Sequence, residues 1–233
     1  MLRIFTDFDG PIMDVSERYY QVYQYCLEAA REPGQEVTQL PKREFWRLKR
    51  AQVPERQIGG ISGLHDAQAR RFALLRREMV HNRAYLKYDR PVPHAVEALQ
   101  RIQTLTEHLA VVTMRRQYAL GFALSQYALE HFFPLQVRYC LPDQYVKSHD
   151  VIEKTRLVGK ALAELSPVSE TWMVGDTEAD IEAAKAHGLP MIAVLSGIRD
   201  RDRLAAYKPD FIVDNLQAAV TIIVEQTPSA SKQ

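Results

Sequence analysis

The stretch Leu2-Arg3-Ile4-Phe5-Thr6-Asp7-Phe8-Asp9-Gly10 decides the fold. Its first five residues form a short, largely apolar run, which is typical of a strand buried on both faces of a parallel sheet. Two carboxylates, Asp7 and Asp9, and a glycine follow this run directly. In open α/β sheets ligands collect beyond the carboxyl ends of strands, so these acids stand where a site is expected. Two such acids can hold a divalent metal, attack a substrate or transfer a proton.

A second segment near the other end of the chain repeats this design. Thr171-Trp172-Met173-Val174 has the composition of a strand and is followed by Gly175-Asp176-Thr177-Glu178-Ala179-Asp180. The glycine and the carboxylates open an expected helix. Because parallel strands place their carboxyl ends at the same edge of a sheet, we expect the two acidic turns to meet at one site.

Short apolar runs with strand character alternate with helical patterns in most of the chain. The runs are Leu2 to Thr6, Leu109 to Thr113, Thr171 to Val174, Met191 to Leu195 and Phe211 to Val213. The helical patterns are Pro93 to Thr104, Glu153 to Leu165 and Ala179 to His187, the last closed by Gly188-Leu189-Pro190. This alternation predicts an α/β protein with a Rossmann-like, doubly wound parallel sheet.

A long segment after the first run contains no convincing strand. It reaches Pro91-Val92-Pro93, and its roughly 80 residues far exceed a usual connecting loop. Helical spacing is present from Ser16 to Arg31, with Ser16 as the expected N-cap, and from Ala67 to Leu86. The expected turns between the helices are Pro33-Gly34, Val53-Pro54 and Gly59-Gly60-Ile61-Ser62-Gly63.

These patterns divide the chain into three parts. Residues 1–14 and 92–225 are expected to form the α/β core, and residues 15–91 an inserted, all-helical cap domain. Residues 226–233 are polar and are expected to be a disordered tail. Opening of such a cap would admit a substrate, and closing would exclude bulk water.

Composition excludes several classes of protein. The 233 residues include 30 Lys and Arg against 29 Asp and Glu, and a net charge of +1 predicts neither a nucleic acid nor a membrane surface as partner. Only Cys26 and Cys140 are present, without metal-ligand spacing, which argues against a disulfide scaffold or structural zinc and favours the cytoplasm. No stretch approaches the roughly 20 apolar residues of a membrane-spanning helix. The oligomeric state is left open.

Four short motifs resemble those of the haloacid dehalogenase (HAD) superfamily, in its phosphoglycolate phosphatase-like branch with a helical cap after the first motif. Asp7-Phe8-Asp9-Gly10-Pro11-Ile12 is similar to the first motif and Val111-Val112-Thr113 to the second. Lys154 is similar to the third, and Gly175-Asp176-Thr177-Glu178-Ala179-Asp180 to the fourth. The resemblance covers nearly the whole chain, although Pro11 stands where the family more often has threonine.

The resemblance implies a Mg²⁺-dependent phosphatase that hydrolyses a phosphomonoester of a small phosphorylated metabolite such as phosphoglycolate. Asp7 would attack phosphorus to form an aspartyl phosphate, and Asp9 would act first as acid and then as base. The implied metal ligands are the carboxylates of Asp7 and Asp176 and the backbone carbonyl of Asp9. The implied phosphate contacts are Thr113, the backbone N–H groups of Met114 and Arg115, and Lys154, with Gly175 and Asp180 in supporting roles.

Two assignments of site residues have competing candidates or explanations. Lys147 and Lys160 compete with Lys154 as the lysine of the third motif. The candidate residues for substrate specificity are Lys49 and Arg50 in the cap and Arg115 in the core, although a solvated helix face is the favoured explanation of the first two.

Other reactions on the same fold are open as well. A phosphomutase would keep every core motif and differ by protecting the aspartyl phosphate from water. A dehalogenase would not need Asp9 as an acid, and a non-catalytic binding or regulatory protein would not need both acids. Phosphonate hydrolysis through an imine of Lys42 or Lys49 is a more remote alternative.

Overall fold

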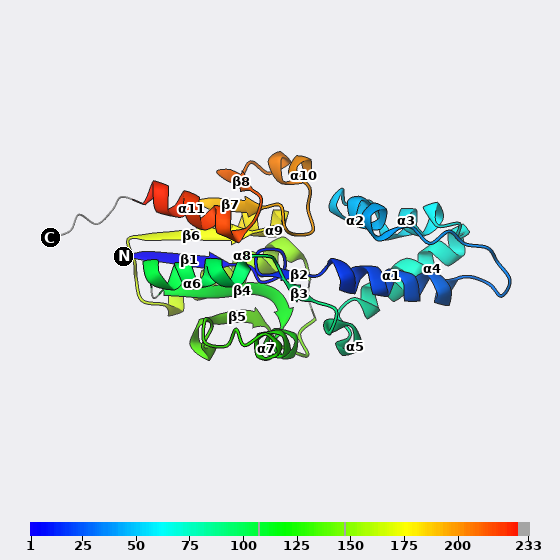
Figure 1. The fold of residues 1–233 in the computed structure, drawn as a ribbon, viewed down its shortest axis with the longest axis horizontal. Coiled ribbons are helices and arrows are strands. Elements are labelled where there is room, and N and C mark those ends of the chain that lie inside the picture. Colours follow the sequence, from blue (N-terminus) through cyan, green and yellow to red (C-terminus); the bar gives the residue numbers. More distant parts are fainter. Residues whose placement is uncertain (107, 147, 228–233) are drawn as a thin grey trace.

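Six parallel strands form one sheet in the order β5-β4-β1-β6-β7-β8 (Figure 1). The computed structural model describes residues 1–106, 108–146 and 148–227. The predicted doubly wound α/β fold is confirmed, and five of the six strands correspond to predicted runs; β5 was not predicted. The strands are β1 (Leu2–Thr6), β4 (His108–Arg116), β5 (Arg138–Leu141), β6 (Glu170–Gly175), β7 (Met191–Val194) and β8 (Phe211–Val213).

Helices cover both faces of this sheet (Figure 1). One face carries α6 (Ala95–Leu105), α7 (Gln117–Gln126) and α11 (Leu216–Gln226), and the other carries α8 (Asp150–Glu164), α9 (Glu178–Ala186) and α10 (Arg201–Ala206). Successive strand residues point to opposite faces. Ile4 therefore packs in the apolar cluster with α6 and α11, whereas Phe5 packs in the cluster with α8 and α9. Burial on both faces explains the nearly continuous apolar runs of the strands.

The order of the strands brings the acidic turns together. From β1 the chain goes on to build β4 and β5 on one side, and it returns to build β6, β7 and β8 on the other. The order reverses at β1, and the carboxyl end of a strand at such a point is where ligands bind in this class of fold. Asp7 follows β1 directly, and its N–H donates to Val174 O of β6 at 2.8 Å. Asp176 follows β6, so the two predicted turns are neighbours.

Five further helices lie to one side of the sheet (Figure 1). They are α1 (Ser16–Ala30), α2 (Lys42–Arg50), α3 (Glu55–Ile61), α4 (Asp66–Met79) and α5 (Arg83–Leu86), and we call them the helical lobe. The lobe has its own apolar cluster, in which the Tyr23 ring stacks on Phe45 at 4.6 Å and meets the edge of Phe72 at 6.0 Å. No helix within the described ranges is both long enough and apolar enough to cross a membrane.

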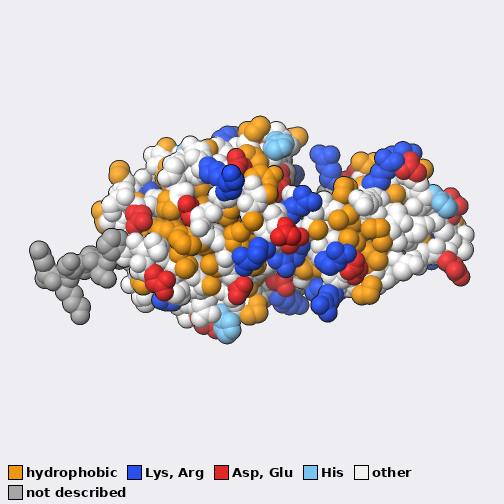
Figure 2. Space-filling model, turned by 90° about the horizontal axis from the view of Figure 1, so that it is seen from above, with side chains coloured by type: hydrophobic (Ala, Val, Ile, Leu, Met, Phe, Trp, Pro, Cys, Tyr) orange, Lys and Arg blue, Asp and Glu red, His pale blue; other side chains and the backbone are white. Residues whose placement is uncertain are grey.

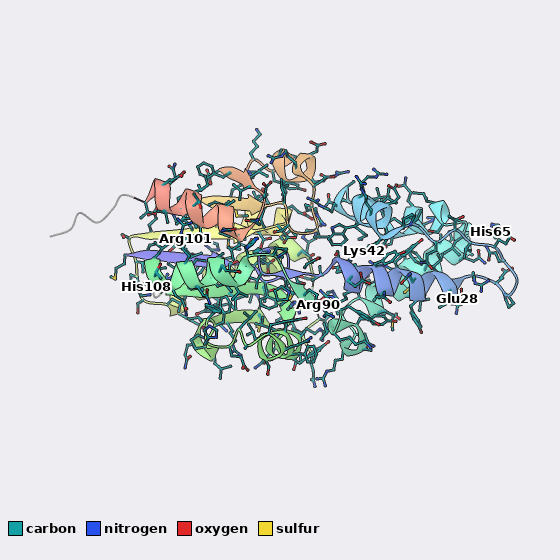
Figure 3. All side chains as sticks on the ribbon, viewed as in Figure 1. Glu28, Lys42, His65, Arg90, Arg101 and His108 are labelled. Carbon is teal, nitrogen blue, oxygen red and sulfur yellow. The ribbon has the colours of Figure 1, made fainter. Side chains whose placement is uncertain are left out.

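A short antiparallel ribbon joins the helical lobe to the sheet. It consists of β2 (Met13–Asp14) and β3 (Arg90–Pro91), with Met13 opposite Pro91 and Asp14 opposite Arg90, which is labelled in Figure 3. Both connections therefore leave the sheet side by side. On this basis we propose the predicted division of the chain into a core of residues 1–14 and 92–225 and an inserted cap of residues 15–91.

Helix boundaries differ from the prediction at both ends of the chain. Ser16 is not the N-cap of α1 but its first helical residue, because the N–H of Ser16 donates to the Asp14 carboxylate at 2.8 Å and the helix begins after Val15. At the other end α11 includes Gln226, so the predicted tail of 226–233 starts too early. Residues 228–233 lie outside the described residues.

Two predictions inside the helical lobe were wrong. The segment Gly59-Gly60-Ile61-Ser62-Gly63 was expected to be a turn, but α3 continues to Ile61. The single helix expected from Ala67 to Leu86 is two helices, α4 and α5. It breaks because the Asn82 side chain accepts a hydrogen bond from a backbone N–H of α5 and thereby caps a new helix.

A partly buried ion cluster connects four helices of the lobe. Glu55 of α3 pairs with Lys49 of α2 and with Arg76 of α4, whose Nε lies 3.1 Å from Glu55 Oε2. Arg76, which is 2% exposed, also donates to Tyr19 O of α1 at 2.7 Å. Burial raises the pKa of Glu55, but the Arg76 and Lys49 cations outweigh burial and hold this pKa below its usual value.

Removing the Glu55 charge is expected to destabilise the helical lobe at neutral pH only. Glu55→Gln leaves the buried Arg76 without an anionic partner, which we expect to lower the free energy of unfolding by about 3 kcal/mol. Because the folded-state pKa lies below the ordinary value of 4.5, this stabilisation is present above the unfolded pKa and is lost as the pH falls through the folded pKa. Urea unfolding at neutral and at acid pH measures the loss of stability and its dependence on pH.

The matched control is Glu44→Gln. Glu44 pairs with Arg47 on the exposed surface of α2, and we expect no measurable change at either pH. A loss for Glu55→Gln that is the same at both pH values would contradict this account of the ion cluster.

Candidate functional site

A fully buried lysine lies at the centre of the site. Lys154 of α8 is 0% exposed, and its Nζ lies 2.8 Å from Asp7 Oδ2, 2.7 Å from Asp180 Oδ1 and 2.8 Å from Val112 O. Burial disfavours the charged amine, but the Asp180 and Asp7 carboxylates outweigh burial and hold the pKa of Lys154 above its usual range. Lys154 is therefore a permanent ammonium beside Asp7.

The structure distinguishes this lysine from one of its competitors. The Lys160 side chain is 60% exposed, and its Nζ lies 3.8 Å from Glu164 on the surface of α8. Lys147 lies outside the described residues. Of the two described candidates for the motif lysine, Lys154 is the one that reaches Asp7.

Three buried carboxylates lie together at the edge of the sheet. Asp7, Asp176 and Asp180 each offer an oxygen within 4.8 Å of the other two. Burial and then the neighbouring Asp180 and Asp7 carboxylates raise the pKa of Asp176 well above its usual range. Burial, only partly offset by Lys154, raises the pKa of Asp7 to about 7. Both pKa shifts come first from the loss of hydration on burial and then from the like charge of neighbouring carboxylates.

This arrangement fits a divalent metal. Three carboxylates face one ammonium, which leaves two negative charges when all are ionised, and a divalent cation carries the opposite charge. Carboxylate oxygens are also the hard ligands that Mg²⁺ prefers. Asp7 and Asp176 lie together in this cluster. Their role as metal ligands, like that of the Asp9 carbonyl, stays a prediction.

Asp180 holds the turn that carries Asp176. Its Oδ2 accepts hydrogen bonds from Asp176 N at 3.2 Å, from Thr177 N at 3.0 Å and from Thr177 Oγ1 at 2.7 Å. Its other oxygen contacts Lys154. A Cβ on Gly175 would lie 2.3 Å from Asp180 Cγ, so the glycine is needed for this approach. The geometry suits the supporting roles predicted for Gly175 and Asp180.

Two more glycines make room for Asp176. A Cβ on Gly197, in the loop after β7, would lie 1.9 Å from Asp176 Oδ2, and one on Gly10 would lie 2.3 Å from Asp176 Cγ. Gly10 also has a φ of +90°, which L side chains rarely adopt. The N–H of Ile198 donates to Asp176 Oδ2 at 2.6 Å. Backbone therefore encloses this carboxylate on two sides.

The second motif is placed differently from its prediction. Thr113 is 1% exposed and lies inside β4, which continues to Arg116 instead of ending at Thr113. The N–H of Arg115 donates to Thr113 Oγ1 at 3.2 Å. This N–H therefore already has an acceptor and does not face outward as part of the predicted phosphate nest. Thr113 and Met114 both line the cavity described below.

Asp9 is held by two arginines. Arg115 Nε donates to Asp9 Oδ1, and Arg18 Nη2 donates to Asp9 Oδ2 at 3.1 Å. Burial raises the pKa of Asp9, but Arg115 and Arg18 outweigh burial and hold this pKa below its usual range. The Arg115 side chain, predicted to contact substrate, thus contacts the expected acid and base. Arg18 was not predicted.

A cavity of about 160 Å³ lies between these residues and the helical lobe. Lys and Arg side chains gather at this junction of sheet and lobe in Figure 2. From the sheet, its helices α8 and α9 and its loops, the lining residues are Asp7, Asp9, Thr113, Met114, Arg115, Asp150, Lys154, Asp176, Thr177, Ala179, Ile198 and Arg199. From the lobe and its connections they are Val15, Tyr19 and His81.

The predicted specificity residues of the lobe do not line this cavity. Lys49 pairs with Glu55 inside the lobe. The guanidinium of Arg50 donates to Leu195 O at 2.9 Å and to Arg199 O at 3.0 Å, so it attaches the lobe to the loop after β7. Their predicted role in specificity is therefore not supported by direct contact. Lys42, labelled in Figure 3, pairs with Glu17 at 2.8 Å.

Sequence reasoning missed Arg199, Tyr19 and His81. Arg199 donates to both oxygens of Glu178, at 2.7 and 2.9 Å, and Arg199 itself lines the cavity. Each of the three comes from a different segment, and no spacing in the sequence connects them. The one available signal was Ser196-Gly197 directly after a predicted strand, which marks a loop at the same edge of the sheet as Asp7.

Comparison with known proteins agrees with this geometry. A family model described as HAD-hydrolase-like matches residues 154–219, which include Lys154, Asp176 and Asp180. A computed superposition on a candidate phosphatase from Clostridium difficile gives a TM-score of 0.71 at 18% identity and covers 95% of this chain and 97% of the other. The chain has the HAD-like fold. The resemblance inferred from the four motifs is thus confirmed.

Other relatives and structures are similar over different extents. A pyrophosphatase PpaX from Anoxybacillus flavithermus is 32% identical over 127 residues, which are 52% of this chain and 56% of the relative. A phosphoglycolate phosphatase from Mesorhizobium japonicum is 25% identical over 59% of this chain and 58% of its own length. The chain thus matches little more than half the length of these curated relatives. A candidate β-phosphoglucomutase from Thermotoga maritima has a TM-score of 0.63 at 20% identity, covering 97% of this chain and 100% of its own.

In this HAD-like site we expect Gly197→Ala to weaken the binding of a divalent cation. The added Cβ would lie 1.9 Å from Asp176 Oδ2 and must displace this carboxylate. A displaced ligand is expected to weaken Mg²⁺ binding by about tenfold or more, measured by calorimetric titration of the folded protein. Gly60→Ala is the control, because a Cβ there meets nothing within 4 Å. Equal Mg²⁺ affinity in the two variants would contradict the assignment of Asp176 as a ligand.

Proposed function

We propose that the chain is a Mg²⁺-dependent phosphatase that hydrolyses small phosphate compounds through an aspartyl phosphate on Asp7. The observation that carries the proposal is the Asp7 carboxylate, which lines the cavity and lies 2.8 Å from the buried Lys154 ammonium. The ammonium favours the ionised, nucleophilic form of Asp7, against the effect of burial. The names of the two curated relatives support a phosphatase.

In the first half of the reaction an Asp7 oxygen attacks phosphorus, and the bond from phosphorus to the leaving oxygen breaks. Lys154 and the Thr113 hydroxyl stabilise the phosphoryl oxygens, and Asp9 gives its proton to the leaving oxygen. A bound Mg²⁺ would be held by Asp7 and Asp176 and would neutralise negative charge on the phosphoryl group. The products are the protonated leaving group, which is an alcohol or, from pyrophosphate, inorganic phosphate, and the aspartyl phosphate.

In the second half Asp9 acts as a base. It takes a proton from water as the water oxygen attacks phosphorus, and Asp7 is released as a carboxylate together with inorganic phosphate. The two arginines beside Asp9 favour this ionised form. To carry a proton in the first half, Asp9 needs a neighbour that favours its neutral form. An incoming phosphate dianion is such a neighbour, because like charges raise the pKa of a carboxyl.

The volume of the cavity favours small substrates. Its volume of about 160 Å³ is below the roughly 300 Å³ at which common ligand pockets begin. The relatives are named for pyrophosphate and for phosphoglycolate, and both compounds combine a phosphoryl group with a short anionic partner. Arg199 and His81 line the wall of this cavity. A cytoplasmic location stays a prediction.

The first test is hydrolysis of 4-nitrophenyl phosphate by the purified protein. We expect release of nitrophenolate that requires Mg²⁺ and is abolished by a chelator. Asp7→Asn is expected to reduce the rate by about 10⁴-fold or more, since it removes the nucleophile. Trapping of phosphate on the wild-type protein in acid-quenched samples, and its absence in Asp7→Asn, identifies the intermediate. Activity that survives in Asp7→Asn would exclude the proposed mechanism.

A second measurement concerns substrate size. We expect kcat/KM for phosphoglycolate or pyrophosphate to exceed that for a nucleoside monophosphate by more than about tenfold, because the cavity has no room for a base and ribose. A sugar bisphosphate is also large for this cavity, which favours a phosphatase over a phosphomutase. Preferred hydrolysis of nucleotides would show that the closed cavity does not define the substrate.

A further inference from the structure

A closed ring of four charged side chains includes the Asp9 carboxylate. Arg115 Nε donates to Asp9 Oδ1, and Arg18 Nη2 lies 3.1 Å from Asp9 Oδ2. Both arginines also contact Asp89: Arg115 Nη2 lies 2.5 Å from Asp89 Oδ2, and Arg18 Nε lies 2.9 Å from Asp89 Oδ1. Each carboxylate thus contacts both arginines. Formal charges within the ring balance.

The members of the ring differ in their access to the cavity. The side chains of Arg18 and Asp89 are each 1% exposed, whereas that of Asp9 is 26% exposed and lines the cavity. Asp89 is not among the cavity-lining residues of the described chain. Asp89 therefore cannot touch a substrate held there. Any effect of Asp89 on the reaction has to pass through the two arginines.

The ring fixes how the two guanidinium groups are turned. Asp89 Oδ2 accepts a hydrogen bond from Arg115 Nη2, and Asp89 Oδ1 forms an ion pair with Arg18 Nε that lacks hydrogen-bond geometry. The backbone acceptors of the same groups are farther away, since Arg18 Nη1 lies 3.3 Å from Val80 O and Arg115 Nη1 lies 3.5 Å from Ala119 O. A buried carboxylate costs desolvation free energy, and here that cost is offset by contacts that orient two cations.

The backbone of Asp89 is itself held by hydrogen bonds. Its N–H donates to Leu86 O at 3.1 Å, and its carbonyl accepts from Tyr127 Oη at 2.5 Å and from Arg90 Nη1 at 2.7 Å. It stands directly before β3 of the ribbon, whereas Arg18 belongs to α1 of the lobe and Arg115 to β4 of the sheet. The ring therefore connects the three parts that meet at the cavity.

We infer that Asp89 is a positioning residue for Asp9, which it orients through Arg18 and Arg115, and that Arg18 makes this orientation depend on the seating of the helical lobe. The inference rests on the proposed function, in which Asp9 protonates the leaving oxygen. Asp89 takes no proton and touches no reacting atom. Its removal leaves both arginines free to turn, and Asp9 then loses its alignment with the leaving oxygen.

Leaving-group dependence separates this role from a general structural one. 4-Nitrophenolate leaves readily without a proton, whereas phenolate needs protonation more, so a misplaced acid slows phenyl phosphate selectively. Asp9→Asn sets the full effect, which we expect to be about 10²- to 10⁴-fold on kcat/KM for phenyl phosphate and much less on kcat/KM for the nitrophenyl ester. The comparison uses kcat/KM because the second half of the reaction is the same for both esters. We expect Asp89→Asn to lower kcat/KM for phenyl phosphate by about 10²-fold, with less than about threefold loss for the nitrophenyl ester.

Two further variants complete the experiment. Asp210→Asn makes the same substitution at a carboxylate that accepts from Met191 N, away from the cavity, and should leave the ratio of the two rates unchanged. Arg18→Met removes the lobe's member of the ring and should shift the ratio in the same direction as Asp89→Asn. The double variant should be no more selective than the stronger single variant, because both act through Asp9. The melting temperature of each variant shows whether it folds. If Asp89→Asn does not fold, Arg18→Met tests the same inference.

The outcomes distinguish a failure of the inference about Asp89 from a failure of the proposed function. If Asp9→Asn is selective against phenyl phosphate but Asp89→Asn and Arg18→Met reduce both esters equally or not at all, the inference about Asp89 is wrong and the proposed function stands. If Asp9→Asn itself is not selective, or the wild-type protein hydrolyses neither ester, the proposed function is wrong and the inference is wrong with it.

Discussion

At the carboxyl edge of the sheet, the ammonium of Lys154 contacts the carboxylates of Asp7 and Asp180 and the carbonyl of Val112, with no exposure to solvent. These partners belong to the turn after β1, to α9 and to β4, while the lysine comes from α8. A buried ammonium is tolerated only among such partners, because desolvation otherwise costs several kcal/mol. The packing of α8 and α9 on the sheet and the ionisation of Asp7 thus depend on the same contacts.

Besides the ribbon, side-chain contacts of the helical lobe reach the site from two sides. On one side Arg18 reaches Asp9. On the other, Arg50 donates to backbone carbonyls of the loop after β7, and the same loop donates from Ile198 N to Asp176. One attachment therefore contacts the expected acid and base, and the other contacts the loop that encloses a candidate metal ligand. A displacement of the lobe affects both ends of the site.

The sequence predicted the parts of the site that local patterns determine. Asp7 and Asp176 follow apolar runs, and the topology of a parallel sheet alone brings such positions together. The resemblance to a known family selected Lys154. In contrast, nothing in the sequence connects Arg18 with Asp89, because their contact depends on how α1 packs beside the ribbon. The strand β5 was missed for a related reason: only every second residue of it is buried, so it lacks the apolar run by which the other strands were found.

The β2–β3 ribbon places the two ends of the helical lobe opposite each other, with Asp14 paired to Arg90. The lobe is therefore a single insertion whose two ends are already held together beside the sheet. The entropic cost of closing such a loop grows only with the logarithm of its length. Helices can therefore be added, removed or exchanged between these two positions with little effect on the path of the remaining chain. The ribbon makes the lobe a replaceable module, so that the surface facing a substrate can diverge while the acids beneath it stay in place.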